Sequence, residues 1–568
     1  MALLSRRDVL QIAAAAAAVA TGGARGAYAA APSQADLLQF DAFGQVTLLH
    51  FTDIHGQLTP VYFREPSVNI GVGEALGQPP HLTGKHLLDA YGLKPGSPEA
   101  YALSAADFAA LARDYVRIGG LDRMATAIKA VRAERPGKVL LLDGGDSWQG
   151  SYVSLKEKGA DMVKAMNALG VDAMTAHWEF TYGAERVLAL KEQLKFPFLA
   201  GNVKDTSFGD PVFEAEKIFE RGGLSIGVIG QAFPYTPIAN PRWMIPDWSF
   251  GIEEDRLRER VEKMRAAKIH LVVLLSHNGF DVDRKLAARV KGIDVILSGH
   301  THDALPAPVK IGDTLIVASG SHGKFLSRLD VEIKDRRIAG YRYKLIPLFA
   351  DVIAPDPDLS ALIASIRMPH EGTLKTVLAR TESLLYRRGN FNGTFDDLIC
   401  QALLKQRDAQ IALSPGFRWG SSLLPNQDIT VEDVFNQTAI TYPTAYRTPM
   451  TGAFLKQILE DVADNLFNPD PYYQQGGDMV RVGGLSYAID IGKPIGQRIG
   501  DMTLTGSGEK IEADKEYMVA GWASVNEGAE GPAIYDVVSE HLRAAKTVRV
   551  EENRSVRVIG ADPRGMAG

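Results

Sequence analysis

The side chains best suited to chemistry in this chain are histidines and aspartates that directly follow short apolar runs. Five of the twelve histidines lie in such places beside carboxylates or amides, with DxH and HxH spacings. Imidazole nitrogens and carboxylate oxygens together bind divalent cations such as Mn²⁺, Fe²⁺ and Zn²⁺. The candidate ligands are Asp53, His55, Asp146, His177, His277, His300 and His302.

Seven ligands are too many for one cation but suit two, with one aspartate shared between them. Pairs of cations a few ångströms apart are the centres of two-metal hydrolases. A single such histidine would more simply be a structural residue, but five at the ends of successive runs favour a metal site. Asn202, after another apolar run, belongs to the same constellation of polar residues.

The apolar runs that carry these residues have strand character, and helical stretches follow them. In layered α/β domains, functional residues collect where the strands end. The alternation therefore predicts an α/β domain that places the candidate ligands at strand ends. The runs span residues 45–56, 138–150, 171–180, 196–203, 269–279, 293–302 and 314–324.

A chain of 568 residues is too long for one core and suggests several domains. We expect the α/β domain at 40–350, with a Gly- and Pro-rich excursion at 60–115 that is a functional segment rather than a core element. A linker at 351–384 and a smaller α/β domain at 385–560 follow. The formal charge of −6 argues against nonspecific binding of nucleic acid.

Residues 1–29 are typical of a removed export signal. Arg6 and Arg7 precede an alanine-rich run too short to span a bilayer, and small residues at 27–29 suit signal peptidase. Paired arginines indicate the Tat route to the periplasm, without membrane insertion, although a chance pair before an alanine-rich helix is the alternative.

The only cysteine, Cys400, lies in a helical apolar pattern, which favours a buried thiol over a nucleophile.

Five motifs, in order along the chain, resemble those of the calcineurin-like metallophosphoesterases: DIHG, GGDSWQG, HWEF, SHNG and GHTH. The most similar branch is the two-domain 5′-nucleotidase type, because SPGFRWG, DVFNQTAITY, TGAFLKQILE and GGLSYAID continue the resemblance. It covers essentially the whole mature chain. It implies a layered β-sandwich domain flanked by helices, followed by a smaller α/β domain of the 5′-nucleotidase C-terminal type.

The resemblance also implies how the candidate ligands divide between two cations. Each cation would be bound by three residues of its own and by one shared carboxylate. The first set is Asp53, His55 and His302, the second is His177, His277 and His300, and Asp146 bridges them.

The stretch around His177 departs from the broad family. Trp178 stands where the family has the histidine that protonates the leaving group, and Thr181 where nucleotidases have the aspartate that orients that histidine. A thiolate or persulfide leaves with little proton donation, whereas an alkoxide needs it. A full ligand set without a general acid therefore favours a sulfur leaving group, because a decayed phosphatase would be expected to lose ligands as well.

The second domain departs from the nucleotidases too. They clamp the base between two aromatic rings, and Pro532 stands where one of these rings belongs, although Phe435 is retained. Base stacking would be weakened, which makes a nucleotide a poor substrate.

The stretch HWEFTYG, together with the twin arginines, resembles the thiosulfohydrolase (SoxB) family of the bacterial Sox sulfur-oxidation system. This implies release of sulfate from a sulfonated cysteine on the SoxYZ carrier arm by two cations, foremost Mn²⁺, although Zn²⁺ or Fe²⁺ would suit the ligands. Arg418 is a candidate for contacting the sulfonate or the arm, or is an ordinary surface arginine. Trp178 is a candidate for lining a narrow channel to the site. Tyr182 lines the channel or is a core residue, and Glu179 is most simply structural.

Two other functions stay open. One is a periplasmic 5′-nucleotidase or cyclic phosphodiesterase, and the other is a non-catalytic, metal-binding assembly factor. We expect a monomer, and we expect the 60–115 segment to dock the carrier, since a protein substrate needs contacts beyond its arm.

Overall fold

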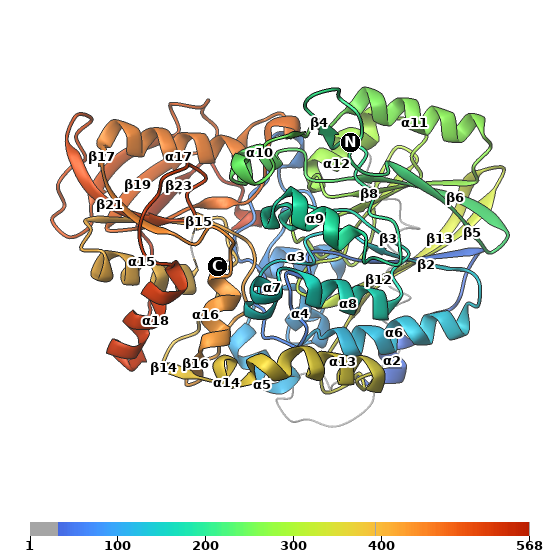
Figure 1. Cartoon of the computed structure of the whole chain (residues 1–568), viewed down its shortest axis with the longest axis horizontal. Coiled ribbons are helices and arrows are strands. Elements are labelled where there is room, and N and C mark those ends of the chain that lie inside the picture. The colour runs from blue at the N-terminus through green and yellow to red at the C-terminus, as the bar shows by residue number, and fades with distance from the viewer. Residues whose placement is uncertain (1–31, 392, 567–568) are drawn as a thin grey trace.

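The protein has two α/β domains, which lie side by side in the computed structural model (Figure 1). The structure describes residues 32–391 and 393–566, so the expected export signal at 1–29 lies outside the described residues. In Figure 1 the N-terminal domain runs from blue to yellow-green and the C-terminal domain from orange to red. The expected fold class is confirmed.

Two sheets face each other in the N-terminal domain. The first has the order β13-β12-β1-β2-β3 and the second β10-β11-β9-β8-β6-β5. In the first sheet, β1, β2 and β3 run parallel; in the second, β6, β8, β9 and β11 do. The strands are β1 (Val46–Phe51), β2 (Val139–Asp143), β3 (Ala173–Met174), β5 (Glu216–Arg221), β6 (Leu224–Gln231), β8 (Leu271–Ser276), β9 (Val295–Ser298), β10 (Val309–Ile311), β11 (Thr314–Ala318), β12 (Phe325–Lys334) and β13 (Arg337–Pro347).

The alternation of side chains along each strand divides them between two apolar layers. In β1, Val46 and Leu48 belong to the cluster between the two sheets, while Leu49 and Phe51 belong to the cluster shared with the flanking helices. Because both faces are covered, β1, β2, β8 and β9 are buried along their whole length. The covering helices are α6 (Leu121–Glu134) and α8 (Ala160–Leu169) on the first sheet and α11 (Glu254–Ala266) and α12 (Phe280–Arg289) on the second.

The segment at 60–115 differs from the excursion outside the core that its composition predicts. It forms three short helices, and their aromatic residues Tyr101, Phe108 and Tyr115 are buried in the same cluster as β1 and α6. Tyr101 stacks on Phe108 with ring centroids 5.6 Å apart. The helices are α3 (Gly84–Tyr91), α4 (Pro98–Leu103) and α5 (Phe108–Tyr115).

The C-terminal domain is built on a four-stranded sheet of order β17-β21-β15-β18, with two three-stranded sheets beside it. Helices pack on the four-stranded sheet: α15 lies against β15 and β18, and α17 against β18. The helices are α15 (Thr394–Gln406), α16 (Val431–Thr438), α17 (Gly452–Phe467) and α18 (Ile534–Ala545). The strands are β14 (Val377–Thr381), β15 (Ile411–Gly416), β16 (Asp428–Thr430), β17 (Ala445–Thr451), β18 (Asp478–Gly483), β19 (Leu485–Asp490), β20 (Ile499–Leu504), β21 (Glu516–Trp522), β22 (Thr547–Val548) and β23 (Val556–Ile559).

The expected linker at 351–384 is ordered and packs on both domains. Its helix α13 (Pro357–Arg367) lies against α6 and α8, and β14 joins a sheet of the C-terminal domain (Figure 1). Within residues 32–391 and 393–566, none of the helices is both long and apolar enough to cross a membrane.

Candidate metal centre

The seven candidate ligands come together at one edge of the two facing sheets, and all are buried. Each follows the carboxyl end of a parallel strand, so the fold delivers loops from both sheets to one place. Asp53 and His55 follow β1, Asp146 follows β2, His177 follows β3, His277 follows β8, and His300 and His302 follow β9.

The backbone of these loops is strained. Five of the seven residues have a positive φ, between 51° and 75°, which residues other than glycine seldom adopt. Each such residue costs about 1–3 kcal/mol and persists where the surrounding structure enforces it, often at a functional site. The five are Asp53, His55, Asp146, His300 and His302.

The ligand atoms form two groups that share one carboxylate. In the first, His302 Nε2 lies 3.0 Å from His55 Nε2 and 3.2 Å from Asp53 Oδ1. In the second, Asp146 Oδ2 lies 3.1 Å from His277 Nε2 and 3.3 Å from His177 Nδ1. Asp146 belongs to both groups, and His300 completes the second.

The chemistry of this donor set fits two divalent cations. His55 Nδ1 donates to the carbonyl of Gln149, so its Nε2 carries a lone pair, and this atom lies 3.0 Å from His302 Nε2. Neither buried ring nitrogen of His177 makes a hydrogen bond, although Nδ1 lies 3.3 Å from Asp146 Oδ2, and such atoms are costly unless another group binds them. Imidazole nitrogens and carboxylate oxygens converging in this way suit Mn²⁺, Fe²⁺ or Zn²⁺.

The charges of the site agree with this fit. Burial raises the pKa of Asp53 to about 8. Burial alone would lower the pKa of His277, but Asp146 and Asp53 beside it raise this pKa to about 10. In the protein alone, protons on His277 and Asp53 thus reduce the buried negative charge, and bound cations would offset that charge instead.

Three of the histidines are oriented by main-chain carbonyl groups that accept their second ring N–H. His55 Nδ1 lies 3.1 Å from the Gln149 oxygen and His277 Nδ1 lies 2.6 Å from the Gly144 oxygen. His300 Nε2 lies 3.0 Å from the Gln475 oxygen. Because a carbonyl only accepts, these contacts determine which nitrogen of each ring is left to bind a cation.

Glu179 holds two of the ligand-bearing loops together, as expected of a structural residue. Its buried carboxylate accepts hydrogen bonds from four backbone amides. Oε2 accepts from Asp146 N at 3.2 Å and His177 N at 2.8 Å, and Oε1 from Ser147 N at 2.7 Å and Trp148 N at 3.2 Å.

Trp178 lies in an aromatic wall between the ligands and the C-terminal domain. Its ring centroid is 5.0 Å from that of His177, 5.0 Å from that of Trp419 and 5.2 Å from that of Phe417. Trp419 in turn lies 5.6 Å from His55. A buried indole, 6% exposed, therefore lies beside the second ligand group, at the position where the family resemblance leads us to expect a proton-donating histidine.

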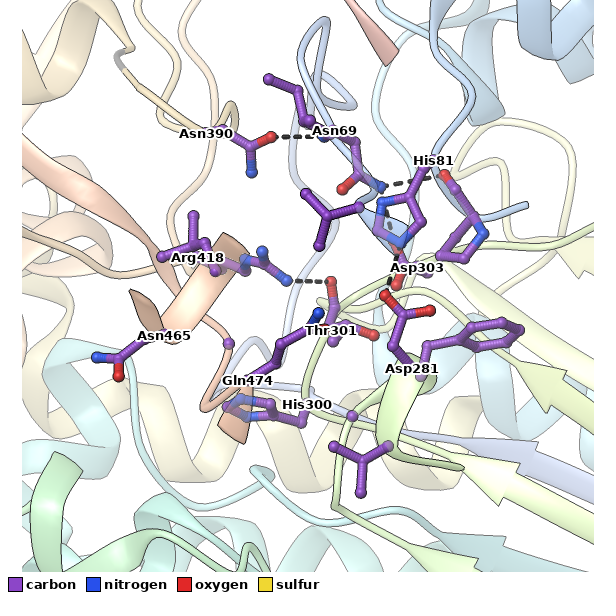
Figure 2. A pocket seen from close by; sticks show the side chains of 18 of the residues that line it. Asn69, His81, Asp281, His300, Thr301, Asp303, Asn390, Arg418, Asn465 and Gln474 are labelled. Atoms are coloured by element: carbon purple, nitrogen blue, oxygen red, sulfur yellow. Dashed lines mark hydrogen bonds and ion pairs between the residues drawn. The ribbon is translucent and has the colours of Figure 1, made fainter. Parts of the chain in front are cut away.

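Arg418 lies in the lining of a pocket that reaches the ligands at His300 (Figure 2). Its Nη1 donates to the Thr301 carbonyl at 3.1 Å, and its Nε pairs with Asp478 at 3.2 Å. The guanidinium is thereby held beside His300, which differs from an ordinary surface arginine. The empty space in and at the mouth of this pocket is about 560 Å³, part of which is open solvent.

Other sequence-derived candidates lie elsewhere. Tyr182 does not line this pocket; its hydroxyl lies 2.9 Å from the carbonyls of Trp148 and Ser154, which makes it the core tyrosine of the alternative interpretation. The Asn202 side chain bonds main-chain groups: its Oδ1 accepts from the Ala232 amide at 2.8 Å, and its Nδ2 donates to the Ala232 and Gly251 carbonyls at 2.7 and 2.9 Å.

Phe435 is not placed to clamp a base. Its ring stacks on Tyr535 with centroids 4.5 Å apart, and the edge of Tyr152 approaches it at 4.8 Å. The ring is 7% exposed, so no face is left for a ligand.

The structure adds residues that the sequence did not single out. His81 and Asp281 pair at 2.8 Å in the lining of the pocket, and Asn69 donates to Asp303 at 3.2 Å (Figure 2). Arg388 donates to the Thr301 carbonyl at 3.2 Å. Only the polar or charged character of these residues was visible in the sequence, because their partners lie between 87 and 234 positions away.

Comparisons with known proteins agree with this geometry. The family profile of the 5′-nucleotidase, C-terminal domain, matches residues 372–540. The structure of sulfate thiohydrolase SoxB from Thermus thermophilus, in complex with glycerol, is similar with a TM-score of 0.88 and 39% identity, over 92% of this chain and 98% of that one. A 5′-nucleotidase precursor from Thermus thermophilus shares the fold, with a TM-score of 0.71 and 22% identity over 91% and 99% of the two chains. The 5′-nucleotidase of Rattus norvegicus is 27% identical over 73% of this chain and 78% of that protein.

Proposed function

Because the chain belongs to the SoxB family within the 5′-nucleotidase superfamily of metallophosphoesterases, we propose that it hydrolyses the thiosulfonate of a cysteine on the SoxYZ carrier arm and releases sulfate. One observation carries the proposal: both ligand groups are complete, while buried Trp178 takes the place of the proton donor. The resemblance to SoxB supports the same substrate class.

The missing acid matches the proposed leaving group. Water adds its oxygen to the sulfonate sulfur, the S–S bond breaks, and the carrier keeps the bond electrons as a persulfide anion; both water protons pass to the medium. A free cysteine thiol has a pKa of about 8.5, and leaving groups of this kind need little protonation. An alkoxide leaving group does need protonation, and a general acid then accelerates the reaction by about 10²–10⁴-fold.

Two cations bound by the seven ligands would lower the pKa of water and polarise the anionic group under attack. The side chains of the protein perform the remaining tasks. Trp178, Phe417 and Trp419 exclude water on one side of the ligands, and Arg418, which is paired with Asp478, places its guanidinium in the pocket beside His300. An anionic sulfonate entering this pocket would meet that guanidinium.

The proposal extends to the setting of the enzyme. We assign the cations as Mn²⁺, with Zn²⁺ or Fe²⁺ as alternatives that the ligands also suit. The Tat-like signal supports export to the periplasm, where the protein would meet SoxYZ as a monomer.

A 5′-nucleotidase or cyclic phosphodiesterase is the second candidate, because several curated relatives are 5′-nucleotidases. The stacking of Phe435 on Tyr535 disfavours this candidate, since Tyr535 covers a face of the Phe435 ring on which a base would have to stack. Phosphate release from AMP at an ordinary enzymatic rate would favour this candidate. A non-catalytic assembly factor would instead bind the carrier tightly without turnover.

The direct test uses purified protein, Mn²⁺ and a SoxYZ carrier whose cysteine bears the thiosulfonate. We expect sulfate release that depends on the metal and vanishes after treatment with a chelator. Sulfate would be measured by ion chromatography, with the unsulfonated carrier as the control. The proposal is wrong if sulfate release does not rise above that of the chelated sample.

The variant Trp178→His tests the interpretation of the missing acid. Because the leaving group departs without a proton, we expect no gain in sulfate release from a restored histidine. Weak hydrolysis of a phosphomonoester such as p-nitrophenyl phosphate is expected to appear. Trp178→Phe is the matched control, since it keeps an aromatic ring and adds no proton donor. A clear gain in sulfate release with histidine but not with phenylalanine would contradict the proposed chemistry.

A further inference from the structure

One of the three carbonyl groups that orient metal-ligand histidines comes from the other domain. The carbonyls of Gln149 and Gly144 belong to the loop after β2, in the same domain as the ligands. The Gln475 carbonyl, which accepts from His300, belongs to the C-terminal domain. It lies in residues 470–477, between α17 and β18, which we call the clasp.

We propose that the clasp completes the second ligand group, so that the affinity for one of the two cations depends on how the domains are docked. The N–H of His300 Nε2 is directed to Gln475, which leaves Nδ1 as the nitrogen available to a cation. A partner of this kind fixes both the tautomer and the orientation of a ligating ring. The inference rests on the proposed metal centre but not on the proposed substrate.

The fit of the clasp against His300 is close. A Cβ atom added at Gly476 would lie 2.5 Å from His300 Nε2, a distance that requires the ring or the clasp to move. The neighbouring Gly477 has a similar positive φ, 77° against 73°, but its Cβ would meet nothing closer than the Gly416 oxygen at 3.6 Å. Of these two residues, only Gly476 must therefore be a glycine because of its contact with the candidate ligand His300.

The clasp is fastened to the N-terminal domain by its own contacts. Lys285 on α12 pairs with Asp470 at 2.5 Å, and its ammonium lies 3.9 Å from the centre of the Tyr472 ring. The Tyr472 hydroxyl donates to Glu254 on α11 at 2.6 Å. The Tyr235 hydroxyl donates to the Tyr472 carbonyl. These contacts hold the segment that presents Gln475 to His300.

The test compares Gly476→Ala with Gly477→Ala in the full chain. Both changes place alanine at a positive φ, so their backbone cost is alike, but only the first reaches His300. We expect wild-type protein and Gly477→Ala to bind two Mn²⁺ ions with equal affinity. In Gly476→Ala, one of the two ions should bind 10–100-fold more weakly, the usual effect of losing such a partner.

Binding is measured by isothermal titration with MnCl₂ and by electron paramagnetic resonance. A coupled two-manganese signal should give way to that of an isolated Mn²⁺ ion in Gly476→Ala alone. If Gly476→Ala does not fold, the double variant Lys285→Ala/Tyr472→Phe, which changes only the fastening contacts, is expected to weaken the same ion.

The outcomes separate the inference from its premise. Two ions bound with wild-type affinity by Gly476→Ala, or by the double variant where the first does not fold, overturn the inference and leave the metal centre intact. A wild-type protein that binds no Mn²⁺ overturns the metal centre and the inference together. Equal weakening of Mn²⁺ binding in Gly476→Ala and Gly477→Ala also overturns the inference. The cause would then be the backbone strain that both variants share, not the contact with His300.

Discussion

Replacement of Asp146 with asparagine is expected to remove at least one of the two cations and to slow turnover by on the order of 10³-fold or more. Asp146 is the only residue that belongs to both ligand groups. Asparagine keeps its size and one oxygen but removes the negative charge that two adjacent cations share. The loss should therefore concern binding rather than folding.

The measurement is the metal content after gel filtration, together with the increase in thermal stability on adding Mn²⁺. A ligand at about 100 times its dissociation constant stabilises a protein by about 2.7 kcal/mol, and this increase should shrink in Asp146→Asn. Asp161→Asn is the matched control, because Asp161 is a buried carboxylate of the same domain that bonds Ser154 and belongs to neither ligand group. Two tightly bound ions in Asp146→Asn would show that this carboxylate is not the bridge.

The ligand residues were accessible from the sequence because their position follows from local patterns. Each follows a largely apolar run, and parallel strands place the residues after them at one edge of a sheet. Spacing such as that of His300 and His302 added a second local signal. The meeting of these residues in two groups could be expected from the motifs, although metal binding itself stays a prediction.

The rest of the site depends on contacts between distant segments, which leave no local pattern. The Gln475 carbonyl that orients His300 is a main-chain group, and any residue type supplies one. His81 lines the pocket because the 60–115 segment folds against α12, not because of its neighbours in the sequence. The Gly and Pro content of that segment predicted an excursion outside the core. The burial of Tyr101 depends instead on the distant segments that pack against it, which composition does not reveal.

Tyr182 shows how the structure separates two interpretations that the sequence left open. The short helix η2 (Trp178–Tyr182) turns the Tyr182 hydroxyl toward the carbonyls of Trp148 and Ser154, which agrees with a core residue rather than a channel residue. Sequence neighbours of a ligand thus have separate roles: Trp178 lies beside the His177 ring, and Glu179 accepts a hydrogen bond from the His177 amide.

Replacement of Glu179 with alanine is expected to destabilise the fold by about 3 kcal/mol or more and to abolish high-affinity metal binding. Four backbone amides lose their shared acceptor, and two of them belong to the ligands Asp146 and His177. Each buried polar group left without a partner costs about 1–3 kcal/mol. Glu179→Gln is expected to fail as well, because its amide would direct N–H groups at N–H groups. The measurements are the thermal midpoint without metal and the Mn²⁺ stoichiometry.

A matched control separates loss of stability from loss of the site. Asp294 is a buried carboxylate at the opposite end of the strands, where it accepts a hydrogen bond from the Val272 amide at 2.7 Å and pairs with Arg265. Asp294→Ala should lower the thermal midpoint but leave two Mn²⁺ sites, since the strand ends that carry the ligands are untouched. Glu179 acts as a positioning residue only if its variants lose metal at a temperature where both proteins are folded. Equal metal binding by Glu179→Ala and Asp294→Ala would reduce its role to general stability, because the four amide hydrogen bonds would then not determine where Asp146 and His177 lie.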